Sequence, residues 1–234
     1  RGMSGEMVQL PLGIQLRETA ELTGFQPGAN AQAVAAVREA AAQRGQRVYL
    51  WGAQGRGKSH LLQAAVRFAS ESGEAAAYLP MADLMLRSPA LLEGLGGMAL
   101  VCVDDVQALA GQRDWEQALT GALDSWRAAN CSVVAAGPVG PAGLSGLLAD
   151  LRTRLGWGAV YALRELDESD KQEVLRRRAA ARGLELPGEV GQYLLRRNPR
   201  SLPGLLELLE RLDHASLVAQ RRLTIPFVRE VLQR

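Results

Sequence analysis

Short apolar runs alternate with longer helical patterns over the first two thirds of the chain. The runs show no strict apolar and polar alternation, which is typical of strands buried on both faces of a parallel sheet. Between them, apolar positions recur at helical spacing, and Asn30 is expected to cap a helix that ends near Arg44. The expected strands are residues 48–51, 75–79, 99–103, 132–136 and 159–163. This order predicts an α/β fold in which helices cover both faces of a parallel sheet and the ligand lies at the carboxyl ends of the strands.

The strand pattern stops after Leu163, and only helical patterns follow. Four helices are expected, at residues 167–182, 187–197, 202–222 and 225–233. Their boundaries carry ordinary helix signals: Asp167 with Asp170 resembles a capping box, Gly183 is a stop, and Thr224 precedes a helix start. The pattern therefore predicts three parts: an extended N-terminal arm (1–25), an α/β core (26–164) and a small all-α domain (165–234).

One octapeptide indicates the chemistry of the core. Residues 52–59 read Gly-Ala-Gln-Gly-Arg-Gly-Lys-Ser, which is a complete G-x-x-x-x-G-K-S phosphate-binding loop between an expected strand and an expected helix. The glycines let backbone N–H groups turn inward around a phosphate, and the start of the helix adds partial positive charge. The ammonium of Lys58 can reach the β and γ phosphates of ATP or ADP, and the Ser59 hydroxyl can bind Mg²⁺. The residues expected around the phosphates are Gly52, Gln54, Gly55, Arg56, Gly57, Lys58, Ser59 and His60.

Two carboxylates follow the third expected strand, Leu100-Val101-Cys102-Val103, as Asp104 and Asp105. The strand delivers them to the sheet edge where the phosphates are expected. Asp104 is placed to bind the hydration shell of Mg²⁺, and Asp105 is a candidate to orient or deprotonate an attacking water. An Asp pair at the end of a strand is also common as a helix cap, so the phosphate loop upstream is what favours the catalytic interpretation.

Composition limits the range of functions. Lys plus Arg is 27 and Asp plus Glu is 25, so the formal charge of +2 does not indicate nucleic-acid binding. No apolar run is long enough to span a bilayer and no secretion pattern precedes the core, so we expect a soluble cytoplasmic protein without a membrane partner. Cys102 and Cys131 lie in or beside apolar strands and are expected to be buried thiols. His60 and His214 have no partner at metal-ligand spacing.

Several segments resemble one known group of proteins. The phosphate loop, the Asp pair and Leu151-Arg152-Thr153-Arg154-Leu155-Gly156-Trp157-Gly158 are similar to the AAA+ ATPases of the bacterial replication-initiator group. Residues 183–187 (GLELP), 212–216 (LDHAS) and 223–228 (LTIPFV) narrow the resemblance to the Hda family, the DnaA-related regulatory inactivators of DnaA. The resemblance extends from Gln9 to the end of the chain. It implies a P-loop AAA+ core followed by a helical lid.

The resemblance also implies roles for particular residues. Arg154 is at the position of the family's arginine finger, which acts in trans on the nucleotide of DnaA; a planar, permanently charged guanidinium suits that task. Phe25 and Pro27 are in the segment that the group lays over the nucleotide base. Gln9, Leu10, Leu12 and Ile14 resemble the short motif that binds the sliding clamp, the β subunit of DNA polymerase III. Such a motif also fits a like groove on a second copy, which would give a homo-oligomer.

Two positions depart from the family pattern. The strand after the Asp pair continues as 133–138, Val-Val-Ala-Ala-Gly-Pro, without the polar side chain that helps AAA+ ATPases to position water. The lid arginine that contacts the bound nucleotide is replaced by Pro203, and Arg200 is the nearest substitute. Both departures favour weak hydrolysis of the chain's own nucleotide and retention of ADP.

These observations lead to one preferred function and two alternatives. We expect a regulatory AAA+ protein that, with the DNA-loaded clamp, stimulates ATP hydrolysis on DnaA and so restrains initiation of chromosome replication. The first alternative is a self-contained AAA+ ATPase that uses Lys58 and Asp105 on its own nucleotide. The second is an adaptor that links clamp and initiator and uses its nucleotide only for folding.

Overall fold

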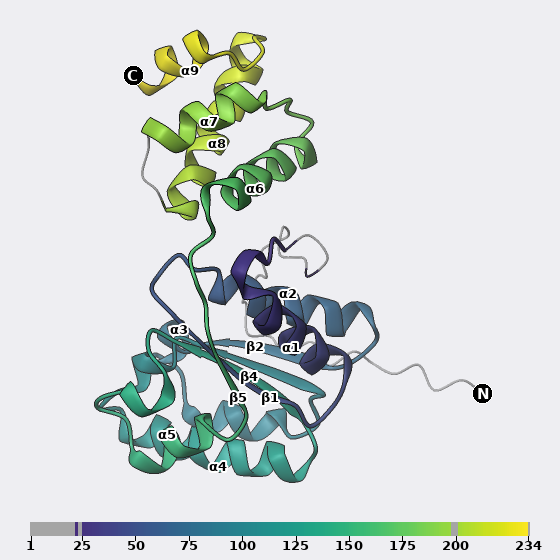
Figure 1. Cartoon of the computed structure of the whole chain (residues 1–234). Coiled ribbons are helices and arrows are strands. Elements are labelled where there is room, and N and C mark those ends of the chain that lie inside the picture. Colours follow the sequence, from purple (N-terminus) through teal and green to yellow (C-terminus); the bar gives the residue numbers. More distant parts are fainter. Residues whose placement is uncertain (1–21, 23–24, 198–200, 234) are drawn as a thin grey trace, which may run out of the picture. The chain divides into compact units, whose positions relative to one another are not determined.

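The computed structural model describes residues 22, 25–197 and 201–233 (Figure 1). These residues form two compact units. One contains Phe25 and Asn30–Arg164, and the other contains Gln26–Ala29 and the chain from Glu165 onward. The short segment Gln26–Ala29 therefore belongs with the C-terminal helices, although it precedes the core in the sequence.

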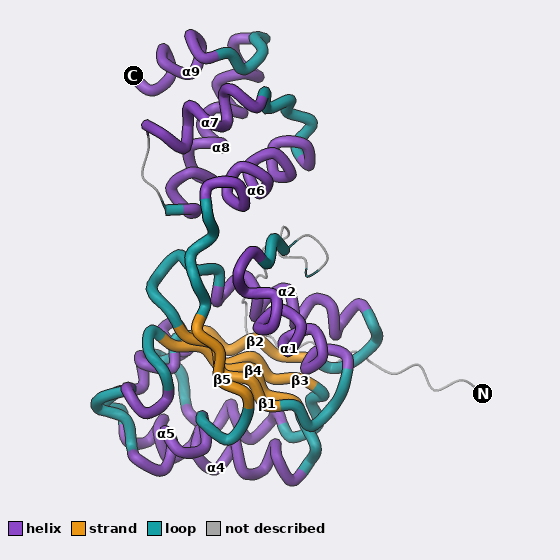
Figure 2. The backbone as a smooth tube through the Cα atoms, viewed as in Figure 1, coloured by secondary structure: helices purple, strands orange, loops and turns teal. Residues whose placement is uncertain are grey.

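A parallel five-stranded sheet forms the centre of the first unit. Its strands are β1 (Arg47–Trp51), β2 (Ala76–Pro80), β3 (Leu100–Asp104), β4 (Ser132–Gly137) and β5 (Ala159–Ala162), in the spatial order β2-β3-β4-β1-β5. Helices cover both faces, as Figure 2 shows. On one face lie α1 (Ala31–Ala42) and α2 (Lys58–Glu71); on the other lie α4 (Arg113–Ala128) and α5 (Ala149–Leu155). The predicted α/β fold with a doubly covered parallel sheet is confirmed.

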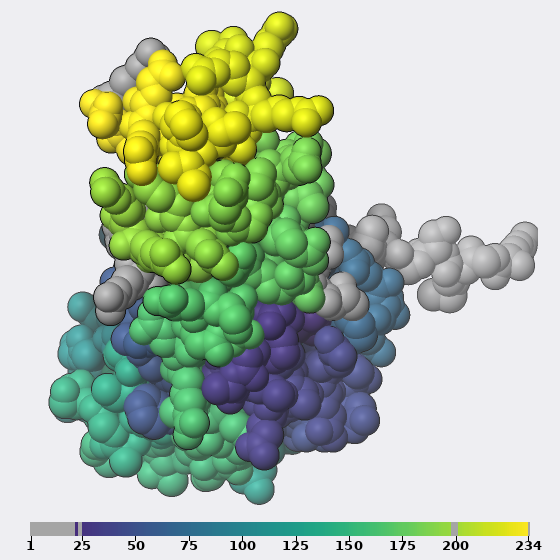
Figure 3. All heavy atoms as spheres, turned by 45° about the horizontal axis from the view of Figure 1, so that its top comes forward, coloured from purple at the N-terminus to yellow at the C-terminus, as the bar shows by residue number. Residues whose placement is uncertain are grey.

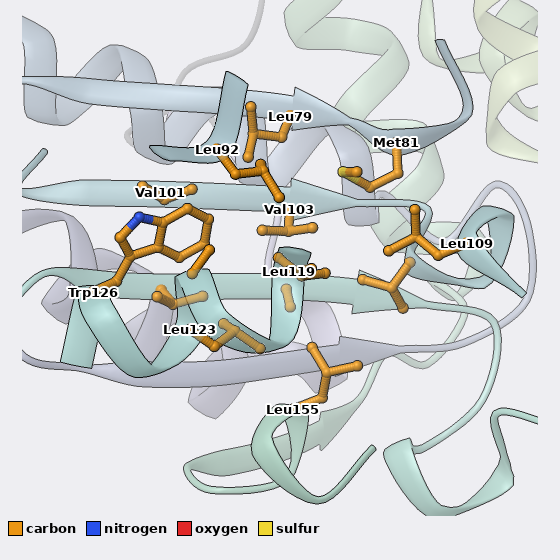
Figure 4. Packing of buried hydrophobic residues seen from close by; sticks show 14 of the residues in the cluster. Leu79, Met81, Leu92, Val101, Val103, Leu109, Leu119, Leu123, Trp126 and Leu155 are labelled. Atoms are coloured by element: carbon orange, nitrogen blue, oxygen red, sulfur yellow. The ribbon is translucent and has the colours of Figure 1, made fainter. Parts of the chain in front are cut away.

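The continuously apolar strands contribute side chains to two separate hydrophobic cores. Successive residues of a strand point to opposite faces, so Val101 and Val103 of β3 pack beneath α4, whereas Leu100 and Cys102 pack beneath α1 and α2. Trp126 of α4 fills the first of these cores together with leucines from β2 and α5 (Figure 4). Because both faces are covered, an apolar side chain is favourable at nearly every strand position, which explains why the sequence shows runs instead of alternation.

Shorter elements complete the first unit. The segment expected as one broken helix is a short helix α3 (Met81–Leu84) followed by a 3₁₀ helix at Pro89–Leu95. Further 3₁₀ turns of this unit are Val106–Leu109 and Pro141–Gly143, and another, Gly28–Asn30, begins in the second unit and ends at Asn30 of the first. Cys102 and Cys131 are buried free thiols as expected, and burial raises the pKa of Cys131 to about 11.

The expected cap of α1 is wrong in one respect. Asn30 stands at the N-cap position, but its side chain makes no capping hydrogen bond. Instead its amide binds Arg164: Nδ2 donates to the Arg164 carbonyl at 3.0 Å, and the Arg164 N–H donates to Oδ1 at 2.7 Å. A side chain whose type suits a local turn therefore ties the start of α1 to the chain that follows β5.

The second unit is a four-helix bundle with its own core. Its helices are α6 (Glu168–Ala181), α7 (Gly188–Arg197), α8 (Leu202–Ala219) and α9 (Ile225–Leu232). Leucines of α6, α7 and α8 contact Phe227 and Val228 of α9 in the interior. Figure 3 shows the atoms of α8 in yellow-green and those of α9 in yellow. The Asp167 carboxylate accepts from the Asp170 N–H at 2.8 Å, so the predicted cap of α6 is confirmed. No helix of the described chain is long and apolar enough to cross a membrane.

Candidate functional site: a phosphate loop and a distant arginine

The phosphate loop lies between β1 and α2, at the carboxyl end of a central strand. Its three glycines have φ values of +152° (Gly52), +81° (Gly55) and +89° (Gly57), which other residues rarely adopt. A Cβ at Gly52 would also lie 2.8 Å from the Leu163 carbonyl. Gly57 stands at the N-cap position of α2. The loop therefore presents backbone to a ligand at the start of a helix, which is a favourable arrangement for an anion.

Lys58 is held against this loop by its own backbone. Its Nζ donates to the carbonyls of Gly52 at 2.6 Å and Ala53 at 3.0 Å. Burial lowers the pKa of Lys58, and the charges of Asp104 and Asp105 act in the opposite direction. The ammonium thus lies at the mouth of the loop, where a phosphate can replace the two carbonyl oxygens as its acceptor.

Asp104 is almost completely buried, with 1% of its surface exposed. Its Oδ1 accepts from the Asp105 N–H at 2.9 Å, and its Oδ2 accepts from the Tyr78 hydroxyl at 2.7 Å. Burial, followed by the Asp104 charge, raises the pKa of Tyr78, which keeps that hydroxyl a donor. Tyr78 is a site residue that sequence reasoning missed. It lies on β2, two residues before the partner of Asp104 in the register of β2 with β3.

The oxygen atoms of Ser59 and Asp104 suit Mg²⁺. A hydroxyl and one carboxylate, completed by water and phosphate oxygens, are a usual environment for that ion. Among the residues that the structure describes, no group of three or more His, Cys, Asp or Glu side chains is arranged to hold a metal. Ser59 and Asp104 could supply two ligands of such an ion, and water or a bound phosphate would supply the rest.

Asp105 and Phe25 both lie near the phosphate loop. Asp105 has a left-handed backbone (φ 54°), is half-buried, and accepts from Gln107 Nε2 at 2.9 Å. Phe25 stacks on His60 with ring centroids 5.7 Å apart and lies 3.6 Å from the place of a Gly57 Cβ. Their roles toward water and base stay predictions, as do those of Gln54 and Arg56.

The end of β4 has no polar side chain, as the sequence indicates. A methyl group at Gly137 would overlap the Tyr49 hydroxyl, which itself donates to the Val139 carbonyl at 3.0 Å. Tyr49, from the neighbouring strand β1, therefore fills the space that a side chain of Gly137 would occupy. Its hydroxyl proton is already engaged by the protein backbone.

Arg154 lies far from this loop, near the other end of β1. It shares a small cavity of about 10 Å³ with Arg47 and Val48, the first residues of that strand. The phosphate loop begins at Gly52, about 13 Å further along at the rise per residue of a parallel strand. The structure therefore does not bring Arg154 together with Lys58, Ser59 and Asp104.

Carboxylates from two helices surround the Arg154 guanidinium. Its Nε donates to both oxygens of Asp124 at 3.0 Å, its Nη2 lies 3.0 Å from Asp124 Oδ2, and its Nη1 lies 2.8 Å from Asp150 Oδ1. These contacts, Asp124 first, raise the pKa of Arg154. The guanidiniums of Arg154 and Arg127 lie 5.3 and 4.6 Å from the centroid of the Trp157 ring.

Some predicted site residues are placed neither at the phosphate loop nor near Arg154. Gln9, Leu10, Leu12 and Ile14 lie outside the described residues, and so does Arg200. Pro27 belongs to the second unit, so its contact with a nucleotide base stays a prediction. Pro203 stands in the first turn of α8, where its missing N–H costs nothing.

Comparisons with known proteins identify the lid and the fold. Residues 168–232 match the family described as Hda, lid domain. Domain III of the replication initiation protein DnaA from Thermotoga maritima is similar over 94% of this chain and 98% of that chain, with 21% identity and a TM-score of 0.82. AMPPCP-bound DnaA from Aquifex aeolicus is similar over 86% of this chain and 68% of that chain, with 25% identity and a TM-score of 0.71.

Another solved structure shares the fold. A point mutant of RuvB from Thermotoga maritima is similar over 92% of this chain and 71% of that chain, with 20% identity and a TM-score of 0.69. The core sheet and the separate helical unit thus correspond to the core and the lid of the AAA+ fold. The chain therefore has an AAA+ fold similar to that of DnaA, and its C-terminal helices match the Hda lid family.

Proposed function

We propose that this DnaA-related replication regulator stimulates ATP hydrolysis on DnaA in trans, together with the DNA-loaded sliding clamp, and so restrains initiation of chromosome replication. The match of its C-terminal unit to the Hda lid and the likeness of its fold to DnaA support this class of function. In this proposal the nucleotide that is hydrolysed belongs to DnaA, and the arginine that promotes its hydrolysis belongs to this chain.

The position of Arg154 is the observation that carries the proposal. Arg154 lies beside the first residues of β1, whereas the chain's own phosphate loop follows the last. A phosphate that Arg154 contacts is therefore bound to another molecule. A guanidinium placed against a γ-phosphate stabilises the charge that develops in the transition state, and an arginine supplied in this way raises the rate by about 10³ to 10⁵.

The chain's own nucleotide has a different role in this proposal. The loop glycines and Lys58 bind the phosphates of ADP or ATP, and Ser59 and Asp104 hold Mg²⁺, which neutralises phosphate charge. The end of β4 offers no side chain to orient a water, because the Tyr49 hydroxyl occupies the space that a side chain of Gly137 would need. We therefore expect slow hydrolysis here, with ADP retained as a structural ligand.

The clamp contact is assigned to the N-terminal segment. Gln9, Leu10, Leu12 and Ile14 have the types and spacing of a short apolar motif with one amide, and Pro11 favours an extended backbone. Docking on a clamp that encircles DNA would raise the local concentration of this chain near DNA-bound DnaA. DNA is then an indirect partner, which agrees with the small net charge of +2.

The decisive experiment measures phosphate release from ATP-loaded DnaA in the presence of clamp, DNA and this protein. We expect Arg154→Ala to abolish the stimulation and to leave folding and ADP binding intact. The matched control is Arg44→Ala, which removes a surface arginine of the same unit that pairs with Glu74. Full stimulation by Arg154→Ala would exclude the proposed role of this residue.

The same assay separates the alternatives. If Arg154→Ala is as active as the wild type while Leu12→Ala is inactive, the adaptor function is favoured. If the isolated chain hydrolyses ATP and Asp105→Asn abolishes that turnover, the self-contained ATPase is favoured. Asp105 lies half-buried directly after the strand that carries Asp104, so this second test has a specific target.

A further inference from the structure

Arg154 is not free to contact a phosphate in this structure. Each of its three guanidinium nitrogens is within 3.0 Å of a carboxylate oxygen, from Asp124 of α4 or Asp150 of α5. Nη1 also donates to the Asp150 carbonyl at 3.3 Å. Only 18% of the Arg154 side chain is exposed, against 47% for Asp124 and 72% for Asp150. We call these three residues the Arg154 cluster.

The charge of the Arg154 cluster opposes the action expected of an arginine finger. One guanidinium against two carboxylates leaves a formal charge of −1 at the place where a triphosphate would have to approach. The side-on face of the guanidinium, formed by Nε and Nη2, is the face that binds a phosphate with two parallel hydrogen bonds, and Asp124 occupies it. While these contacts persist, Arg154 contributes neither charge nor that bidentate geometry to another molecule.

A second cation lies beside the cluster and is not neutralised. The Arg127 guanidinium lies over the same Trp157 ring as Arg154 and makes no ion pair with any residue in the described part of the chain. Its charge acts on Asp124, whose pKa is lowered first by the hydrogen bond from Arg154 and more weakly by Arg127. An approaching phosphate is thus attracted by Arg127 to a place from which it can compete for Arg154.

We propose that Asp124 and Asp150 hold Arg154 in a neutralised position, and that the phosphates of another molecule's nucleotide release it by replacing these carboxylates. The two aspartates are then positioning residues that restrain the finger. The inference rests on the proposed action of Arg154 in trans and adds a regulatory step to it.

The exchange is favourable because one oxyanion, a phosphate, replaces another, a carboxylate. Arginine forms bidentate pairs with carboxylate and with phosphate in the same geometry, so the hydrogen bonds that Arg154 gives up with Asp124 form again with the triphosphate. Ion pairs that remain partly exposed to water contribute little free energy to stability. A partner therefore needs little free energy to separate Arg154 from Asp124 and Asp150. A buried pair with the same geometry would be much harder to separate.

The first test needs neither DnaA nor the clamp. In the ¹⁵N-arginine-labelled full chain, Arg154→Lys identifies the Nε–H signal of Arg154 by its disappearance. We expect that signal to exchange slowly with water in the wild type and rapidly in Asp124→Asn. Rapid exchange in the wild type would overturn the proposal, because the guanidinium would not be held in solution.

The second test measures the consequence for function. Stimulated phosphate release from ATP-loaded DnaA is followed against the concentration of this protein, for the wild type, Asp124→Asn and Asp150→Asn. Loss of an exposed ion pair should lower the half-saturating concentration roughly two- to five-fold. Asp114→Asn is the matched control, because it removes the same charge from the first turn of α4, away from the cluster.

The outcomes separate this inference from the function on which it rests. If Asp124→Asn loses stimulation while it keeps its melting temperature, Asp124 orients Arg154 for use and the restraint is excluded. If Asp114→Asn produces the same gain as Asp124→Asn, net charge explains the effect and the restraint is again excluded. If the wild type gives no stimulation, the proposed function fails, and the exchange experiment alone still decides whether Arg154 is held.

Discussion

The phosphate loop and the Arg154 cluster lie at opposite ends of β1 and are built in different ways. The loop is made by backbone: three glycines with positive φ, the start of α2, and two carbonyls that hold Lys58. The Arg154 cluster is made by side chains from α4 and α5, and its main contacts are ion pairs whose carboxylates are open to water. A site made by backbone is preformed and rigid, whereas a site made by partly exposed ion pairs can be rearranged by a competing anion.

The largest expected effect tests whether the two sites are independent. Lys58→Ala removes a charged group that donates hydrogen bonds at the mouth of the loop, and such bonds contribute about 1.5–3 kcal/mol each. We expect affinity for ADP to fall roughly 10- to 100-fold, as measured by titration with a fluorescent nucleotide. Arg154→Ala should leave that affinity unchanged, since Arg154 lies near the other end of β1. Equal losses in both variants would show that the two sites are coupled.

A smaller effect, on stability and Mg²⁺-dependent binding, is expected at Tyr78, which donates to Asp104. Tyr78→Phe removes the donor to Asp104 Oδ2, in a carboxylate that is 1% exposed. Leaving a buried acceptor without its donor costs about 1–3 kcal/mol. We expect the free energy of unfolding in urea to fall by that amount, together with weaker Mg²⁺-dependent nucleotide binding.

The control for this change is Tyr161→Phe on the edge strand β5. The Tyr161 hydroxyl makes no hydrogen bond with residues 22, 25–197 or 201–233, so its removal should leave stability unchanged. If both variants unfold at the same urea concentration as the wild type, Tyr78 does not support Asp104.

The difference between the sites also explains what the sequence could predict. The phosphate loop is recognisable because its constraints are local: the glycines, Lys58 and Ser59 are within eight consecutive residues. The Asp pair is recognisable for the same reason, since it directly follows an apolar run. The parallel sheet follows from runs that are apolar at every position, because both faces of each strand are covered.

Contacts between distant segments could not be predicted. Asp124 is 30 residues from Arg154, and Tyr78 is 26 residues from Asp104, so no spacing pattern links them. Asn30 shows the opposite error: its type suits a local cap, but its amide is used by Arg164, 134 residues away. The role of Arg154 is indicated only by resemblance to a family. An arginine on a helix is most often part of an exposed ion pair, and Arg154 itself forms ion pairs with Asp124 and Asp150.

The smallest expected effect uses pH to distinguish backbone from side-chain stabilisation. The pKa of Asp124 is lowered mainly by the hydrogen bond from Arg154, and that of Asp167 mainly by the backbone N–H of Asp170 at the start of α6. A carboxyl whose pKa is lower in the folded state stabilises the fold above its unfolded pKa, near 4, and loses that contribution as the pH falls through the folded value. Both groups should therefore become protonated at a lower pH than an unpaired aspartate.

Arg154→Ala should separate the two carboxylates. Removal of the guanidinium should return the pKa of Asp124 toward its usual range, with Arg127 opposing part of that rise, whereas Asp167 keeps its backbone donor and its low pKa. Carboxyl ¹³C shifts followed from pH 2 to 6 measure both groups in one sample. An Asp124 that titrates normally in the wild type would mean that Arg154 is not paired in solution; an Asp167 that shifts in the variant would mean that the change spreads beyond the cluster. If only Asp124 shifts, the pair of Arg154 with Asp124 is a local side-chain ion pair, which is the kind of contact that the phosphate of a partner can replace.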